Sequence, residues 1–429
     1  MLESAAVVFL LLLLIGAGMP IFLALGLSGL LGLFMEGGIT TISFAPSSFF
    51  GQLNSFELIA LLLFILMGDL LSTTPVGENL FNVAVRWLSW LRGGLAIATV
   101  GTSTLFGAVS GVSIAGVAAV GSIAVPQMLD RGYSKSLASG SVVASGALAM
   151  LIPPSVPFII YGAISGVSIS ALFIGGIVPG VVLAMALSLY IYIRATARPE
   201  EAPRSDLSFS WAERFRSLLS IWHAALLVLA ILGSIYAGIA TPSEASAIGA
   251  ACAFLIALYY RRITFQSLLR TLKSTSSVCG SILLIIGCSK IFGDYLNLIE
   301  VPQKLTSALT ATNLPSWSIL LIVMLLLILL GMLIDAVSLI VVTTPILLPL
   351  IESLGYSPLW FGIVLVLNLE MAVVTPPVGL NLYVLRGVCP NLKIEEIIKG
   401  ALPFVAVQFL VLMLFVLVPE MGLWLPSLM

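Results

Sequence analysis

Charged residues are scarce in this chain. Asp, Glu, Lys and Arg make up only 9% of its 429 residues, whereas 60% are hydrophobic; soluble domains carry about 25% charged residues. So few charges could not cover the surface of a soluble protein of this size, and the composition therefore predicts an all-α polytopic membrane protein. The net charge of −1 leaves no basic surface for a nucleic acid.

Histidine and paired cysteines are also scarce. The chain has one histidine, His223, and four cysteines without metal-ligand spacing, which argues against a zinc or iron site. A serine intramembrane protease needs a serine and histidine in one site, and an aspartyl type needs Gly-x-Gly-Asp. Gly68-Asp69 and Gly293-Asp294 both lack the first glycine. We therefore expect neither an enzyme nor a bound cofactor.

Long apolar runs are abundant instead, and a membrane helix needs about 20 such residues. Ten full crossings are predicted, at about residues 1–18, 20–35, 55–73, 135–163, 171–193, 218–240, 243–260, 274–296, 357–385 and 401–424. The stretches 94–128 and 317–350 are too long for one crossing and too short for two, which indicates re-entrant hairpins. Segments 78–92 and 298–314 are predicted to lie in the interface as arms leading into the hairpins.

Lysines and arginines predict the orientation, because short loops rich in these residues stay in the cytoplasm. Sixteen of the eighteen fall on one side of the predicted crossings, and the exceptions are Lys290 and Lys304. This side is predicted to be cytoplasmic, with both chain ends outside. The first crossing lacks the features of a cleavable signal, so we expect it to be retained. An alternative is one long helix over residues 5–34, kinked at Pro20, with the N-terminus inside.

The chain repeats itself after 223 positions. This shift places Gly132-Tyr133-Ser134 on Gly355-Tyr356-Ser357 and Pro153-Pro154 on Pro376-Pro377, and eight of the 29 positions from 126 to 154 match. An odd number of crossings, five, separates the two Gly-Tyr-Ser turns, so the second half is inverted. We predict two inverted repeats of five helices each, residues 1–194 and 218–429, joined by a cytoplasmic connector at 195–217. Each repeat contains one hairpin and one broken helix, at 135–163 and 357–385.

Four breaks interrupt the predicted membrane helices: the hairpin tips at 107–113 and 335–338, and the stretches 152–155 and 375–379. Irregular backbone at membrane depth survives only where it is buried in protein or lines a wet cavity, and secondary transporters use such breaks to bind ions and substrates. We therefore expect both tips to meet near the middle of the membrane. The alternative is that the paired prolines merely bend two helices.

Several motifs carry a resemblance to a known family. They are Phe106 to Gly111, Ile152-Pro153-Pro154-Ser155, Tyr161-Gly162, Thr241 to Ala245, Gly331 to Asp335, and Thr375 to Asn381. Together they resemble the large membrane subunit (DctM/SiaM type) of tripartite ATP-independent periplasmic (TRAP) transporters, over about residues 5 to 424. This resemblance implies a sodium-coupled importer of the bacterial inner membrane, with a transport domain that moves like an elevator against a scaffold.

The resemblance also implies partners and sites. The partners are a separate small four-helix membrane subunit, a periplasmic substrate-binding protein, a small organic anion as substrate, and membrane lipid. Sodium ions would be bound near Ser110, Gly111, Pro153, Pro154 and Ser155 in the first half, and near Asp335, Val337, Thr375, Pro376 and Gly379 in the second. We expect the substrate to contact Ser113, Ser338, Asn381 and Lys290.

Two points stay open at the level of the residues. Lys290 either contacts an anionic substrate or is neutralised by Asp294, one helical turn away. Asn368 and Glu370 are expected to form hydrogen bonds inside the transport domain.

Two other transport functions compete with that of a TRAP subunit. A channel would not need an inverted repeat with two hairpins. The alternative function is a stand-alone sodium-coupled dicarboxylate carrier, which needs no binding protein.

Overall fold

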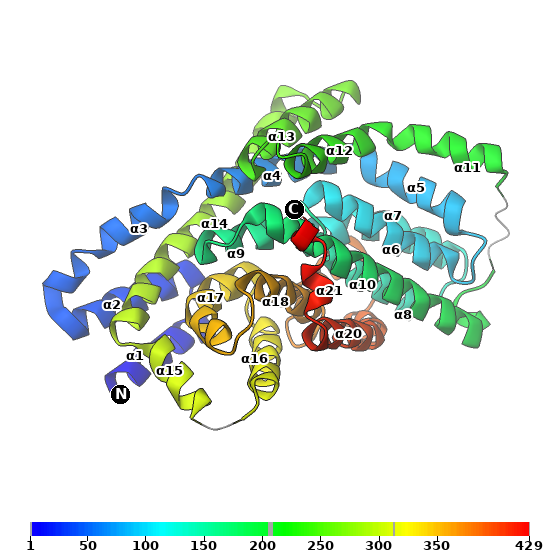
Figure 1. The fold of residues 1–429 in the computed structure, drawn as a ribbon. Coiled ribbons are helices and arrows are strands. Elements are labelled where there is room, and N and C mark those ends of the chain that lie inside the picture. The colour runs from blue at the N-terminus through cyan, green and yellow to red at the C-terminus, as the bar shows by residue number, and fades with distance from the viewer. Residues whose placement is uncertain (1, 205–208, 312–313, 429) are drawn as a thin grey trace.

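The computed structural model describes residues 2–204, 209–311 and 314–428, which form helices and no strand (Figure 1). One set of helices, the outer group, packs around the long helix α14 and its neighbours. This group contains α1 (Leu2–Gly16), α2 (Ile21–Ile42), α3 (Ala45–Leu53), α4 (Glu57–Ser72), α5 (Val76–Leu88), α11 (Trp211–Leu218), α12 (Trp222–Tyr236), α13 (Pro242–Tyr259), α14 (Phe265–Leu298) and α15 (Val301–Thr310).

The remaining helices form the inner group, in which α8 packs against α6, α7 and α20, and α18 packs against α10, α16 and α20. Its members are α6 (Gly94–Ser110), α7 (Ser113–Asp130), α8 (Lys135–Ala147), α9 (Val156–Ser165), α10 (Ile169–Ala197), α16 (Ser316–Gly331), α17 (Ala336–Ser353), α18 (Pro358–Ala372), α19 (Leu380–Val388), α20 (Ile394–Leu417) and α21 (Glu420–Leu423). Helix α5 packs against α6 and α7, and α15 against α17, so each predicted arm contacts a hairpin.

Most helices correspond to predicted crossings, but several boundaries differ: α14 begins at Phe265 where residue 274 was expected, and α20 spans Ile394–Leu417 where residues 401–424 were expected. Eight described helices are long and apolar enough to cross a membrane, and α3 with α4 forms one further candidate, bent by 56°. Helix α2 is interrupted at Gly37 and Gly38, which leave helical φ and ψ angles about two residues after the predicted end at residue 35, and a further short helical stretch follows to Ile42. Helices α1 and α2 are separate and pack against each other, so residues 5–34 do not form one helix.

The end of the connector is helical and joins the next crossing. Helix α11 runs through a 3-10 turn at 219–221 into α12, so its residues are continuous with the next apolar helix. It lies along α5, where the Trp87 ring stands edge-on to Trp211 and Phe215, and the Trp87 Nε1–H donates to the Arg214 carbonyl at 3.2 Å.

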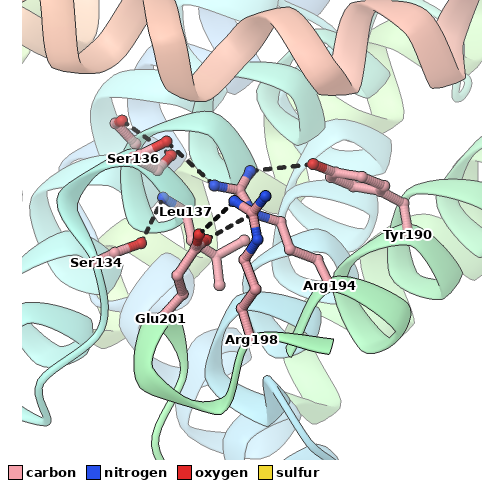
Figure 2. Close-up of polar contacts among 8 residues, drawn as sticks. Ser134, Ser136, Leu137, Tyr190, Arg194, Arg198 and Glu201 are labelled. Carbon is pink, nitrogen blue, oxygen red and sulfur yellow. Dashed lines mark hydrogen bonds and ion pairs between the residues drawn. The ribbon is translucent and has the colours of Figure 1, made fainter. Parts of the chain in front are cut away.

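The start of the connector is fixed to the inner group by a partly exposed polar cluster (Figure 2). Glu201 accepts from Arg194 Nε at 2.7 Å and from Arg198 Nη1 at 3.0 Å. Arg194 also donates to the Tyr190 hydroxyl at 3.0 Å and to Ser136 Oγ at 3.3 Å, on α8. We call these five residues the connector latch. It holds the first residues of the connector against the beginning of the first broken helix.

The two Gly-Tyr-Ser turns adopt the same local structure. Gly132 and Gly355 take left-handed φ angles of 78° and 84°, which glycine adopts without steric cost and which end α7 and α17. Ser134 and Ser357 are then the N-cap residues of α8 and α18. Equivalent residues therefore end one helix and begin the next in both halves. The opposite orientation of the halves in a membrane stays a prediction.

Candidate functional site

All four breaks in the membrane helices meet around one cavity of about 390 Å³, which we call the central cavity. The first hairpin turns at Gly111 and Val112, between α6 and α7, and the second turns between α16 and α17. The first broken helix is interrupted between α8 and α9 and the second between α18 and α19. Five of the predicted site residues line this cavity: Gly111, Ser113, Asp335, Val337 and Asn381.

Four helices begin at the central cavity. Its lining includes the first two residues of α7, α9, α17 and α19, which are Ser113-Ile114, Val156-Pro157, Ala336-Val337 and Leu380-Asn381. The first N–H groups of a helix have no partner within the helix and carry a partial positive charge. This arrangement favours an anion in the cavity. It arises because each hairpin and each broken helix restarts a helix at the same depth.

At the first hairpin tip, the backbone packs directly against the first break. Ser110 is fully buried, and its Oγ has no hydrogen-bond partner within the described chain. Gly111 has φ = 65°, and a Cβ added to it would collide with the Pro154 carbonyl oxygen. The Gly111 carbonyl accepts from the Val156 N–H at 3.4 Å. The Ser110 hydroxyl, on the residue before this backbone contact, is therefore a buried oxygen atom that the described chain leaves available to a ligand.

Ser155 shapes this break from the other side. Its Oγ accepts from the Phe158 N–H at 3.4 Å and donates to the Met150 carbonyl. The hydroxyl therefore caps α9 and closes the turn over Pro153 and Pro154. The structure brings these predicted residues next to Ser110 and Gly111, behind the wall of the central cavity.

The second tip repeats this packing. The Val378 N–H donates to the Met332 carbonyl at 3.2 Å, so a break again bonds to a hairpin tip. Gly379 has φ = 50°, and a Cβ there would lie 3.0 Å from the Thr375 carbonyl oxygen. The Thr375 hydroxyl donates to the Met371 carbonyl at 2.6 Å. Gly379 and Asp335 border a second, smaller cavity of about 230 Å³.

The hairpins also approach the broken helices in the same way in both halves. A Cβ added to Gly107 of α6 would lie 2.7 Å from Ala149 Cα, and one added to Gly331 of α16 would lie 2.5 Å from Ala372 Cβ. Ala149 and Ala372 are equivalent under the shift of 223 positions. Each hairpin therefore seats a glycine on the same place of its broken helix, where no larger residue fits.

One side-chain pair joins the two halves at the central cavity. Asn381 Nδ2 donates to Ser113 Oγ at 2.8 Å, and Ser113 Oγ lies 3.0 Å from Asn381 Oδ1. Both side chains are buried, and they come from the first hairpin and the second broken helix. The predicted substrate residues Ser113 and Asn381 thus form one unit.

Ser338 and Lys290 are not brought to the central cavity. Ser338 Oγ donates to Asp335 Oδ2 at 2.5 Å, and Asp335 Oδ1 accepts from the Ser338 N–H at 3.0 Å, which caps α17. Lys290 pairs with Asp294 at 2.7 Å and lies in a separate cavity. Of the two alternatives for Lys290, the ion pair with Asp294 is therefore the one present in the structure.

Two polar residues of the cavity wall escaped the sequence analysis. Ser277 and Ser281 lie on α14, opposite the hairpin tips, and border the central cavity. Their spacing of four residues puts them on one helix face, but this signal was hidden in a run rich in serine.

Of the two residues that were expected to form hydrogen bonds inside the transport domain, Asn368 donates to the Met324 carbonyl at 2.9 Å. The prediction for Glu370 was wrong: it is fully buried, and neither carboxylate oxygen has a partner within the described chain.

Comparison with known proteins assigns the chain to a family. The model of the family "Tripartite ATP-independent periplasmic transporter, DctM component" matches residues 7–421. The chain belongs to this family. It is accordingly an integral inner-membrane transport protein and not an enzyme, and the resemblance seen in the motifs is confirmed.

Members of the DctM family with different named substrates are similar to this chain. The C4-dicarboxylate TRAP transporter large permease protein DctM of Vibrio cholerae is 34% identical over 99% of this chain and 98% of its own length. The sialic acid TRAP transporter large permease protein SiaM of the same organism is 32% identical over 96% of each chain. The isethionate TRAP transporter permease protein DctMQ of Oleidesulfovibrio alaskensis is 35% identical over 95% of this chain, which spans 64% of that relative's length.

A solved structure shares the fold. The YdaH transporter of Alcanivorax borkumensis superposes with a TM-score of 0.65 at 16% identity, covering 91% of this chain and 89% of its own. At this identity the likeness concerns the fold alone. It agrees with the all-α membrane architecture expected from the sequence.

Proposed function

We propose that this DctM family member is the transport subunit of a sodium-coupled importer of small organic anions. The observation that carries the proposal is the convergence of four helix N-termini on the central cavity. Each N-terminus carries roughly half a positive charge, and Ser113, Asn381, Ser277 and Ser281 add hydrogen-bonding groups. No lysine or arginine lines this cavity among the described residues.

The substrate class follows from this lining together with the relatives. A cavity of about 390 Å³ suits a small molecule. The relatives' names refer to C4-dicarboxylates, sialic acid and isethionate, which share an acidic group on a small polar body. A carboxylate or sulfonate would lie against the helix N-termini, with hydroxyl groups directed at the serines and Asn381.

Sodium coupling is supported by the two hairpin tips. The hydroxyl of Ser110 has no hydrogen-bond partner in the described part of the chain, and Ser110 precedes the backbone turn where Gly111 meets Pro154. At the second tip, the Thr375 carbonyl lies beside Gly379, close to the Asp335 carboxylate, which borders the same cavity. Sodium bound at these two places would bring positive charge next to the central cavity, and ion and anion would then stabilise each other.

An elevator movement and two partner proteins complete the proposal. The inner group carries every break, whereas α14 of the outer group supplies the opposite wall through Ser277 and Ser281. A rigid inner group sliding along α14 would expose the cavity to either side of the membrane in turn. A small membrane subunit would support the outer group, and a periplasmic binding protein would deliver the substrate.

Uptake into proteoliposomes tests the proposal. The chain, its small membrane subunit and its binding protein are reconstituted and offered labelled succinate, isethionate or N-acetylneuraminate. An inward sodium gradient should drive accumulation of at least one of them. Equal accumulation under a proton gradient without sodium would refute the coupling ion. Full uptake without the binding protein would instead identify a stand-alone carrier.

A further inference from the structure

A further cavity, of about 290 Å³ and distinct from the two described above, lies between α14 and α17. We call it the outer cavity. It is lined by Ser289, Lys290, Gly293 and Asn297 of α14, by the second half of α17 from Val341 to Pro349, and by Gln52 of α3 and Ile164 of α9. Lys290 is the one charged residue among the described residues that line it.

Three elements place the outer cavity toward the periplasm. Helix α14 begins next to Arg261 and Arg262 and carries Arg270 and Lys273 in its first turns, so its other end, where Lys290 lies, points away from the cytoplasm. The end of α9 at Ile164 precedes α10, whose far end carries Arg194. Ile164 is therefore also on the periplasmic side.

The outer cavity and the central cavity share the α14 wall. Ser277, Ser281 and Ile285 border the central cavity, and the series continues with Ile286 and Lys290 in the outer cavity. Because a helix rises about 1.5 Å per residue, Lys290 lies about 14 Å from Ser281 along the axis. Between the two levels, Ser289 Oγ donates to the Val341 carbonyl at 3.0 Å and joins α14 to α17.

The charge of Lys290 is only partly used inside the protein. Its Nζ carries three donors, and within the described chain the side chain makes one hydrogen bond, to Asp294 Oδ1 at 2.7 Å. The side chain remains 41% exposed. A cation on a membrane helix is costly, and such residues line ion and substrate pathways.

We infer that the outer cavity is a second binding site for the substrate anion, used on its way from the periplasm to the central cavity. Lys290 binds the carboxylate or sulfonate, and Asp294 weakens this attraction and limits how long the anion stays. The inference rests on the proposed function, because it takes the substrate to be an anion. It places the contact between Lys290 and the substrate in the outer cavity and not in the central cavity.

Charge-selective labelling of a cysteine tests the inference without requiring transport. Asn297→Cys, in a chain whose four native cysteines are replaced by alanine, places an exposed thiol in the outer cavity, two helical turns from Lys290. Right-side-out membrane vesicles are treated with 2-sulfonatoethyl methanethiosulfonate or with its cationic trimethylammonium counterpart. The ratio of the two rates reports the electrostatic potential at the thiol and cancels differences in its reactivity.

The expected changes have opposite signs for the two members of the ion pair. Lys290→Gln should lower the ratio of the anionic to the cationic rate by about threefold, and Asp294→Asn, which removes a charge three residues from the thiol, should raise it by at least as much. Lys290→Arg should keep the ratio within about twofold. The control is Lys273→Gln, because Lys273 is an exposed lysine of the same helix that lies 24 residues, about 36 Å along the axis, from Asn297, and it should change the ratio little.

Potassium isethionate or potassium succinate should slow labelling by both reagents in the chain that retains Lys290. This protection should be lost in Lys290→Gln. An unchanged ratio in Lys290→Gln, a shift of the same sign in Lys290→Gln and Asp294→Asn, or labelling from the cytoplasmic side alone would each overturn the inference. A chain that shows the expected labelling but no uptake in proteoliposomes would refute the proposed function alone. Uptake with charge-insensitive labelling would refute the outer site alone.

Discussion

Replacing Gly107 by alanine tests whether the first hairpin must lie against the first broken helix. The added Cβ would lie 2.7 Å from Ala149 Cα and 3.2 Å from Ala149 Cβ, whereas two carbon atoms pack at about 3.5 to 4.0 Å. The hairpin therefore has to retreat by about 1 Å. Such overpacking costs about 1 to 3 kcal/mol, and alanine returns about 1 kcal/mol through its higher helix propensity.

Gly101→Ala is the matched control in the same helix. Its Cβ would meet only Leu88 Cδ1, at 3.7 Å, which is an ordinary contact, so this variant keeps the gain in propensity without the clash. We expect Gly101→Ala to be neutral or slightly stabilising and Gly107→Ala to be less stable than Gly101→Ala by about 1 to 3 kcal/mol. The difference between the two variants isolates the packing at the hairpin tip.

The functional effect of Gly107→Ala should appear in sodium dependence, because Ser110 and Gly111 lie within one turn of the clash. A loss of about 1.4 kcal/mol in sodium binding raises the half-saturating sodium concentration tenfold. Thermal unfolding of the purified complex and uptake against sodium concentration measure the two effects. If Gly107→Ala matches Gly101→Ala in both assays, the tip does not depend on this approach and the placement of the first sodium site is wrong.

Three further predictions use other parts of the chain. Ser110→Ala should raise the half-saturating sodium concentration about fivefold, because it removes one oxygen ligand; an unchanged sodium curve would exclude this ligand. Single cysteines at Ser134 and Ser357 should be labelled from the cytoplasm and the periplasm respectively, and labelling of both from one side would refute the inverted repeat. Glu201→Gln should destabilise the connector latch by about 1 to 3 kcal/mol, whereas Glu200→Gln, at an exposed position, should not, as thermal unfolding will show. Burial opposes the charge of Glu201, but the bonds from Arg198 and Arg194 hold its pKa below the usual value, so the latch should be constant from about pH 6 to about pH 8 and weaken only as the pH falls through that lowered pKa.

The sequence predicted the interrupted helices well because each interruption has a local chemical cause. Gly111, with its left-handed φ, and the proline pairs at 153 and 376 interrupt the helix locally, and the observed breaks fall within about four residues of the expected ones. The repeated Gly-Tyr-Ser turns were visible for the same reason, since a left-handed glycine and a capping serine act through their immediate neighbours.

Residues whose role depends on distant packing were harder to predict. Lys290 was assigned to the substrate by its charge alone, but its height on α14 places it about 14 Å from Ser281 along the helix axis. Ser277 and Ser281 were not singled out, because nothing local distinguishes them from the other serines between residues 274 and 281. Only the packing of α14 against the hairpin tips shows which serines face the central cavity.

Among the described residues, no lysine or arginine lines the central cavity, and the proposed mechanism gives a physical reason for this. Four helix N-termini together supply a partial charge of roughly +2. The carboxylate of Asp335 offsets about one unit of this charge, and the remaining charge of about +1 suits one acidic group of a substrate. A fixed lysine at this place would repel sodium at both tips, which lie directly behind the wall. Helix termini spread their charge over several N–H groups, so that anion and sodium can occupy adjacent places. Lys290 is compatible with this arrangement because it lies beyond the wall shared with Ile285 and Ile286, where it meets the anion before sodium and substrate are bound together.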